Sequence, residues 1–200
     1  GLYSYKGIQK RVCFHSREIR GRKDAFNPDI IDYKSFVADL SQLMAAIPMC
    51  IYASHIDKER HVNQYIHPIE PYDLCMTFVL ERILRDLPVN QNCVIILESR
   101  GAKEDRAVLD FIKGLIDNGT RFHPASHFSR IKGVYFNPKW CKAADDRMSY
   151  WELELADLCA YPIQKFFVYG TMDLAFQVIL PKLSHYPDHM GKGLKSFPIT

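Results

Sequence analysis

Apolar residues recur at helical spacing in four stretches of the chain. These stretches cover residues 30–47, 72–87, 103–118 and 151–167. A proline or a glycine directly follows each of the first three, which is typical of a helix end. The fourth contains Pro162, so we expect its helix to kink or to stop early.

Three short apolar runs rich in strand-forming residues separate these helices, at residues 49–56, 93–97 and 131–136. The run at 93–97 is continuous instead of alternating, which predicts a central strand that is buried on both faces of a parallel sheet. Strands and helices alternate, so we expect an α/β fold with a mixed, mainly parallel sheet. A length of 200 residues suits a single domain over residues 1–200.

The composition is that of an ordinary folded protein, with 48% hydrophobic and 24% charged residues. No stretch reaches the roughly 18 uninterrupted apolar residues of a membrane span. The first residues also lack the apolar core of a signal peptide. The six cysteines lie far apart without C-x-x-C spacing. We therefore expect a cytoplasmic protein with reduced cysteines and no membrane association.

Positive charge is concentrated near the start of the chain, although the net charge is only +3. Residues 6–23 hold a single acid, Glu18, among many cations. Arginine binds phosphate bidentately, so this segment is a candidate nucleic-acid contact; a solvated loop is an equally good interpretation. The cations are Lys6, Lys10, Arg11, Arg17, Arg20, Arg22 and Lys23.

Several familiar chemistries lack their motifs. The chain contains no G-x-G-x-x-G, no Walker A loop and no G-x-S-x-G elbow. Two histidine pairs, His123 with His127 and His185 with His189, have the i to i+4 spacing of zinc ligands. Each pair lacks an evident third ligand, so we expect these histidines to be ordinary surface or core residues.

Three acids stand at the ends of apolar elements or within them. Glu98 directly follows the most apolar run, and ligand sites form at the carboxyl ends of such strands. Asp157 interrupts an apolar helix, where a carboxylate needs a partner. Glu18 lies between cations. Gathered at one sheet edge, these acids would bind Mg²⁺, which prefers oxygen ligands. Each acid also fits a solvated surface position.

Four segments in a fixed order resemble the prokaryotic domain-of-unknown-function family numbered thirty-eight hundred. They are residues 15–20 (HSREIR), 98–101 (ESRG) with Asp105 following, 154–158 (ELADL) and 193–198 (GLKSFP). Members are similar to ribonuclease H in fold, so the resemblance implies a ribonuclease H-like three-layer domain. It also implies Mg²⁺ or Mn²⁺ at Glu18, Glu98 and Asp157, with Arg100 and Asp105 either supporting these ligands or facing the substrate. The basic segment adds His15, Arg17, Arg20, Arg22 and Lys23 as candidate substrate contacts.

The chain departs from the family at its start. The family opens with a strand ending in Asp-Glu-Ser-Gly, whose aspartate is the expected central metal ligand, and this sequence has no such motif. The resemblance therefore implies a domain that lacks its first strand in this sequence and a metal site without its central acid.

Three hypotheses follow. The first is a Mg²⁺- or Mn²⁺-dependent nuclease that acts on RNA, DNA or a hybrid, in prokaryotic defence. The second is a catalytically degenerate module that binds nucleic acid or a partner protein, with the acids in structural roles. The third is a structural subunit of a homo-oligomer or of a larger assembly. Cation binding that depends on Glu98 and Asp157 distinguishes the first from the others.

Overall fold

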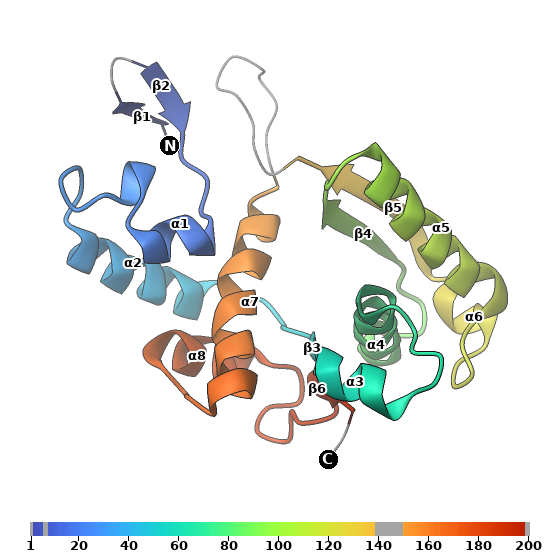
Figure 1. Cartoon of the computed structure of the whole chain (residues 1–200). Coiled ribbons are helices and arrows are strands. Elements are labelled where there is room, and N and C mark those ends of the chain that lie inside the picture. Colours follow the sequence, from blue (N-terminus) through green and yellow to red (C-terminus); the bar gives the residue numbers. More distant parts are fainter. Residues whose placement is uncertain (1, 6–7, 139–149, 199–200) are drawn as a thin grey trace. The chain divides into compact units, whose positions relative to one another are not determined.

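The computed structural model describes residues 2–5, 8–138 and 150–198 (Figure 1). Lys6 of the basic segment lies outside these residues. The described part combines helices with short strands, two of which pair in parallel, so the α/β class is confirmed. None of the helices within these ranges is long and apolar enough to cross a membrane.

The chain divides into two compact units, and each unit is built from two segments. The first unit comprises residues 1–49 and 137–180, and the second comprises residues 50–136 and 181–200. The chain passes between the units three times. A single domain over the whole chain stays a prediction.

The first unit is mainly helical. An antiparallel hairpin of β1 and β2 opens the chain, and α7 contacts both α1 and α8. Helix α2 begins at Asp32, whose carboxylate accepts two backbone N–H groups of the first turn, as an N-cap residue does. The elements are β1 (Leu2–Tyr5), β2 (Ile8–Arg11), α1 (Ser16–Gly21), the 3-10 helix η1 (Asp24–Phe26), α2 (Tyr33–Ala46), α7 (Trp151–Tyr169) and α8 (Leu174–Ile179).

Helix α7 continues past Pro162 to Tyr169, so the predicted early stop is wrong. Proline removes one helical hydrogen bond. Here Pro162 and Ile163 are both buried, and the packing of this part of the helix offsets the lost bond.

The second unit contains two strand pairs with helices between and around them. β3 pairs in parallel with β6, so that Ala53 lies opposite Leu194. The Cys93 N–H donates to the Arg130 carbonyl, so β4 and β5 begin side by side. The elements are β3 (Ala53–Ile56), α3 (Lys58–Gln64), α4 (Pro71–Asp86), β4 (Cys93–Glu98), α5 (Ala102–Asn118), α6 (Ala125–Phe128), β5 (Ile131–Asn137) and β6 (Leu194–Phe197), with the 3-10 helix η3 (Leu180–Lys182) at the boundary.

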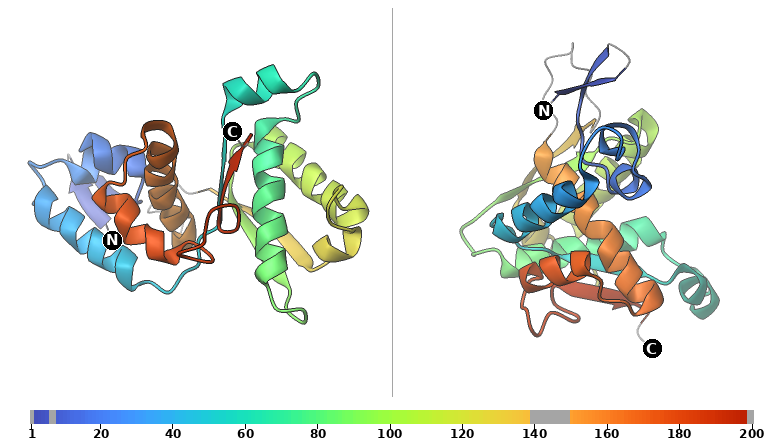
Figure 2. Two further views of the ribbon diagram at one scale, coloured as in Figure 1. Left: turned by 90° about the horizontal axis from the view of Figure 1, so that it is seen from below. Right: turned by 90° about the vertical axis from the view of Figure 1, so that its left-hand side faces the viewer.

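The core of the second unit lies where α4, α5, α6 and β5 meet. Helix α4 lies between the β3–β6 pair and α5 (Figure 2). The buried side chains of this core are Leu80, Leu84, Ile112, Leu115, Phe128 and Ile131. Burial of such aliphatic and aromatic side chains is the main favourable contribution to folding.

Two predictions about the sheet need correction. The described strands form three separate pairs and not one mixed sheet, because no hydrogen-bonded ladder joins one pair to the next. β4 is also not buried on both faces, since Val94 is 56% exposed. The core of the second unit packs against the face with Cys93, Ile95 and Leu97.

Candidate functional site

Two carboxylates lie one helical turn apart on α7, at Glu154 and Asp157. Glu154 is buried, at 8% exposure, and the Asp157 side chain is 35% exposed. Side chains three residues apart lie on the same side of a helix. The sequence singled out Asp157 alone, although Glu154 stands in the same apolar stretch three residues before it.

Both carboxylates bind the backbone of the segment that leads into α1. Glu154 Oε2 accepts the Phe14 N–H at 2.8 Å, and Asp157 Oδ2 accepts the Ser16 N–H at 2.9 Å. His15, the N-cap residue of α1, makes no side-chain cap bond of its own. Asp157 therefore caps α1 from a helix more than 100 residues away in sequence.

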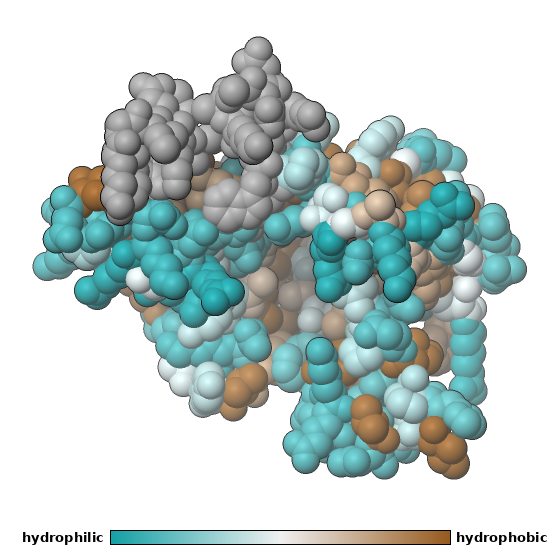
Figure 3. All heavy atoms as spheres, turned by 45° about the horizontal axis from the view of Figure 1, so that its top comes forward, coloured by the Kyte–Doolittle hydropathy of each residue, from teal (hydrophilic) through white to brown (hydrophobic). Residues whose placement is uncertain are grey.

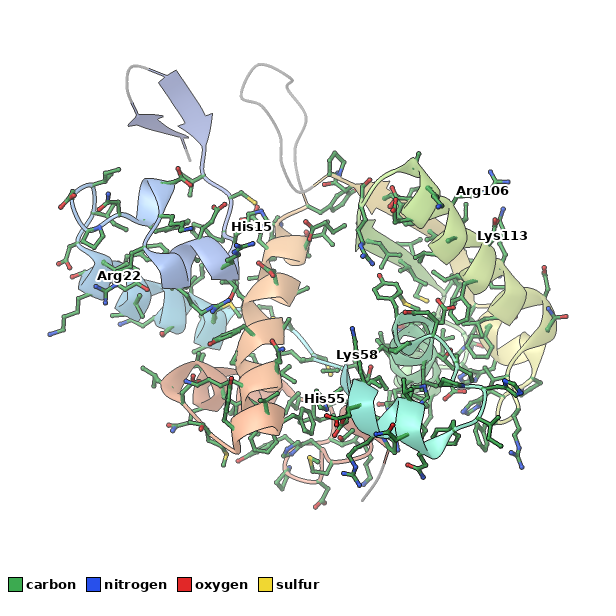
Figure 4. All side chains as sticks on the ribbon, in the orientation of Figure 1. His15, Arg22, His55, Lys58, Arg106 and Lys113 are labelled. Atoms are coloured by element: carbon green, nitrogen blue, oxygen red, sulfur yellow. The ribbon has the colours of Figure 1, made fainter. Side chains whose placement is uncertain are left out.

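His15 lies between α1 and α7 (Figure 4), and its imidazole approaches the same carboxylate. Its Nδ1 lies 3.6 Å from Asp157 Oδ2, which is ion-pair distance when the ring is protonated. A carboxylate offers about four acceptor sites. Asp157 is partly exposed, so solvent or a cation can reach the part of it that does not face α1.

The predicted phosphate-binding cations Arg17, Arg20, Arg22 and Lys23 are exposed, on α1 and directly after it. Glu18 belongs to the same helix and is half-buried. The side chain of Ser16 joins the two groups, because the Arg20 Nε donates to its Oγ while its backbone N–H donates to Asp157. The structure thus gathers these residues around α1.

Glu98, Arg100 and Asp105 belong to the second unit. Glu98 ends β4, as predicted from the sequence, and its side chain is exposed. The Asp105 carboxylate accepts the Ser99 hydroxyl at 2.6 Å and the Arg100 N–H at 2.8 Å. These two hydrogen bonds lower the pKa of Asp105. The Arg100 guanidinium lies 5.4 Å from the centre of the Tyr72 ring.

The gathering of Glu18, Glu98 and Asp157 around one ion stays a prediction, because the structure describes Glu98 in a different unit from the other two. Their carboxylate oxygens are the donor type that Mg²⁺ and Mn²⁺ take. Among residues 2–5, 8–138 and 150–198, however, no group of three or more His, Cys, Asp or Glu side chains is arranged to hold a metal ion.

A second polar cluster, around Asp86 at the end of α4, was not anticipated from the sequence. Asp86 Oδ2 accepts hydrogen bonds from the Tyr52 hydroxyl, the Ser184 hydroxyl and His185 Nε2, all at 3.0 Å. The neighbouring Arg85 adds a bidentate contact. Four residues therefore converge on one carboxylate.

These contacts change the ionisation of the cluster. Burial alone would raise the pKa of Asp86, but hydrogen bonds from Arg85, Tyr52 and Ser184 outweigh it and lower that pKa well below its ordinary value. Burial and the nearby carboxylate raise the pKa of Tyr52 to about 12. Asp86 thus joins the C-terminal segment to α4 as an ionised acceptor.

The two histidine pairs have ordinary protein partners. The rings of His123 and His127 stack 4.3 Å apart, and His127 Nε2 contacts the Glu81 carbonyl. Burial lowers the pKa of His127. In the other pair His185 contacts Asp86, and His189 Nδ1 contacts the Pro187 carbonyl.

Comparisons with protein-family models, with curated proteins and with solved structures find no match for this chain. Both the family resemblance and its ribonuclease H-like fold therefore stay predictions.

Proposed function

We propose that this chain is a nuclease of the ribonuclease H-like type that hydrolyses phosphodiester bonds of RNA, DNA or a hybrid with Mg²⁺ or Mn²⁺. One observation carries the proposal. Helix α1, which bears the exposed arginines, is capped by a carboxylate of α7, because Asp157 accepts the Ser16 N–H. Arg20 contacts the hydroxyl of the same serine. Groups suited to phosphate and a group suited to a metal ion thus adjoin within the first unit.

Each residue has a role in this proposal. Glu18, Glu98 and Asp157 would supply carboxylate oxygens to the metal, and the bound ion would activate water and stabilise the leaving oxygen. His15 would orient Asp157, which it approaches to 3.6 Å. Cationic side chains would neutralise the phosphates of the substrate, and Asp105 would position the loop that follows Glu98.

The connection from β4 through α5 to β5 supports the finer assignment of fold. It is a parallel strand–helix–strand unit, and Glu98 ends its first strand. Such units build ribonuclease H-like sheets as well as other α/β sheets, so the assignment also rests on the four family-like motifs. A cytoplasmic location agrees with the free thiols of Cys50, Cys75 and Cys93.

A second candidate is a module that binds nucleic acid or a partner protein without cleavage. The observation in its favour is that Glu154, Asp157 and Asp105 each bind backbone N–H groups of neighbouring segments. Such contacts alone are a sufficient structural reason for carboxylates at these positions.

A cleavage assay distinguishes the two candidates. Labelled single-stranded, duplex and hybrid substrates are incubated with Mg²⁺ or Mn²⁺, and in parallel with chelator. The test variants are Asp157→Asn, whose amide oxygen can still accept the Ser16 N–H, and Glu98→Gln. Asp110→Asn is the matched control, because Asp110 makes only an exposed ion pair with Arg106.

The nuclease proposal expects cleavage that needs the metal, disappears in both test variants and persists in the control. Absence of cleavage on every substrate, with binding retained in both test variants, would favour the binding module instead.

A further inference from the structure

The residues from Ser16 to Asp24 carry four exposed cations against two acids. We call Arg17, Arg20, Arg22 and Lys23 the α1 cationic patch. In the space-filling view, hydrophilic side chains predominate over the coloured part of the first unit (Figure 3). Exposed cations clustered in this way form a candidate binding surface for a negatively charged partner.

Two of the three guanidinium groups in the patch lie over aromatic rings. The Arg20 Cζ lies 3.4 Å from the centre of the Tyr161 ring, and its Nε also contacts Ser16 Oγ. The Arg22 Cζ lies 4.9 Å from the centre of the Tyr33 ring, beside α2 (Figure 4). Side chains fixed in this way lose less conformational entropy when they bind a partner.

Tyr33 is itself fixed, because its hydroxyl donates to the Ile19 carbonyl of α1 at 3.0 Å. Both rings are half-buried, and each already has a guanidinium over it. The rings therefore serve to orient the arginines, and they offer little surface on which a nucleic-acid base could stack.

The backbone of Arg22 provides independent support. Arg22 ends α1 in the left-handed conformation, with φ 50° and ψ 44°, and its N–H binds the carbonyls of Glu18 and Ile19. Glycine is the favoured residue at such a helix end, because a side chain there has a steric cost. The backbone conformation alone does not favour an arginine at this position, so its side chain must supply a contact: with Tyr33, with the helix dipole or with a partner.

We propose that the α1 cationic patch binds the phosphodiester backbone of nucleic acid without reading its sequence, and that Tyr33 and Tyr161 position Arg22 and Arg20 for this contact. The inference rests on the proposed function for the class of partner. Binding through the patch needs neither a metal ion nor cleavage, so the two can be tested separately.

The test measures the binding of two labelled single-stranded oligonucleotides of unrelated sequence to the full chain in chelator. Fluorescence anisotropy over a range of salt concentrations gives the affinity and its salt dependence. Each lost phosphate contact reduces the slope of log K against log salt by about 0.7 on a single strand. We expect Arg20→Gln and Arg22→Gly each to weaken binding severalfold and to reduce the slope by about that amount.

Arg22→Gly separates an effect on binding from an effect on stability, because its binding should weaken while its thermal midpoint should not fall. Tyr161→Leu keeps every cation and should weaken binding with little change in slope, whereas Tyr161→Phe should bind as the wild type does. Arg106→Gln on α5 is the control for charge alone and should leave the affinity unchanged, since Arg106 lies outside the patch.

Wild-type affinity and slope in both arginine variants would overturn the proposal, as would binding of only one of the two sequences. Cleavage in Mg²⁺ that is unchanged in the patch variants would support the nuclease proposal and overturn the binding role of the patch. Binding that depends on the patch, without cleavage of any substrate, would support the binding role and overturn the nuclease proposal.

Discussion

Asp157 in the first unit and Asp86 in the second are both aspartates on long helices, and both join a distant segment to their helix. Asp86 accepts hydrogen bonds from four side chains and is 17% exposed. Asp157 accepts the backbone N–H of Ser16, lies near His15 and is 35% exposed. The side chain of Asp157 is thus about twice as exposed as that of Asp86.

The difference indicates which acid is structural and which is suited to chemistry. A carboxylate surrounded by hydrogen-bond donors is a strong structural link, because removal of the acceptor leaves several partners unsatisfied. A carboxylate that caps a helix and still reaches solvent can also bind a cation. The comparison predicts that loss of Asp86 damages stability, whereas loss of Asp157 damages the proposed activity.

The largest expected effect is that of Asp86→Ala. We expect it to lower the free energy of unfolding by about 3 kcal/mol, because Arg85, Tyr52 and Ser184 lose a shared charged acceptor. Urea unfolding followed by circular dichroism measures the change. Asp110→Ala, at an exposed ion pair, is the control and should cost less than about 1 kcal/mol. Equal losses in the two variants would show that the Asp86 cluster contributes no more to the free energy of unfolding than an exposed ion pair does.

The contribution of Asp86 should also appear in the pH dependence of the free energy of unfolding. Because the pKa of Asp86 is lower in the folded protein than in the unfolded chain, its contribution is complete above the unfolded value and is lost as the pH falls through the folded value. We expect the wild type to lose stability below about pH 4 more steeply than Asp86→Asn does. Urea midpoints at successive pH values test this, and parallel curves would contradict it.

Much of the secondary structure could be predicted from the sequence, because long helices bury a continuous apolar stripe. Helix α4 was expected over residues 72–87 and spans Pro71–Asp86, and α5 was expected over residues 103–118 and spans Ala102–Asn118. Helices α1 and α3 were missed. Each is only one or two turns long, and a single buried pair such as Ser16 and Ile19, of which only Ile19 is apolar, is too weak a pattern to be recognised.

The polar clusters were predictable only in part. Asp157 could be singled out because it interrupts an apolar helix, and Glu98 because it ends an apolar strand. Asp86 follows the exposed Arg85 and lies two residues before the exposed Pro88, so its sequence context is that of a surface charge. Its partners Tyr52 and Ser184 lie 34 and 98 residues away, and only the tertiary structure brings them together.

Substitution of Asp157 should have a smaller effect on stability than substitution of Asp86. Asp157→Ala removes the acceptor that caps α1, which typically costs about 1 kcal/mol. Asp157→Asn should cost less, since its amide oxygen still accepts the Ser16 N–H. Thermal unfolding of the two variants measures the difference. A loss as large as that of Asp86→Ala would mean that Asp157 is a structural acid of the same kind.

The smallest effect concerns Asp105, a third helix-associated aspartate with two donors. Its pKa is lowered first by the Ser99 hydroxyl and then by the Arg100 N–H. Ser99→Ala removes the first contact and keeps the second, so we expect the pKa of Asp105 to rise part of the way toward its ordinary value. Carboxyl-detected nuclear magnetic resonance titration follows Asp105 directly. An unchanged Asp105 titration would contradict this expectation and would mean that backbone N–H groups alone lower its pKa.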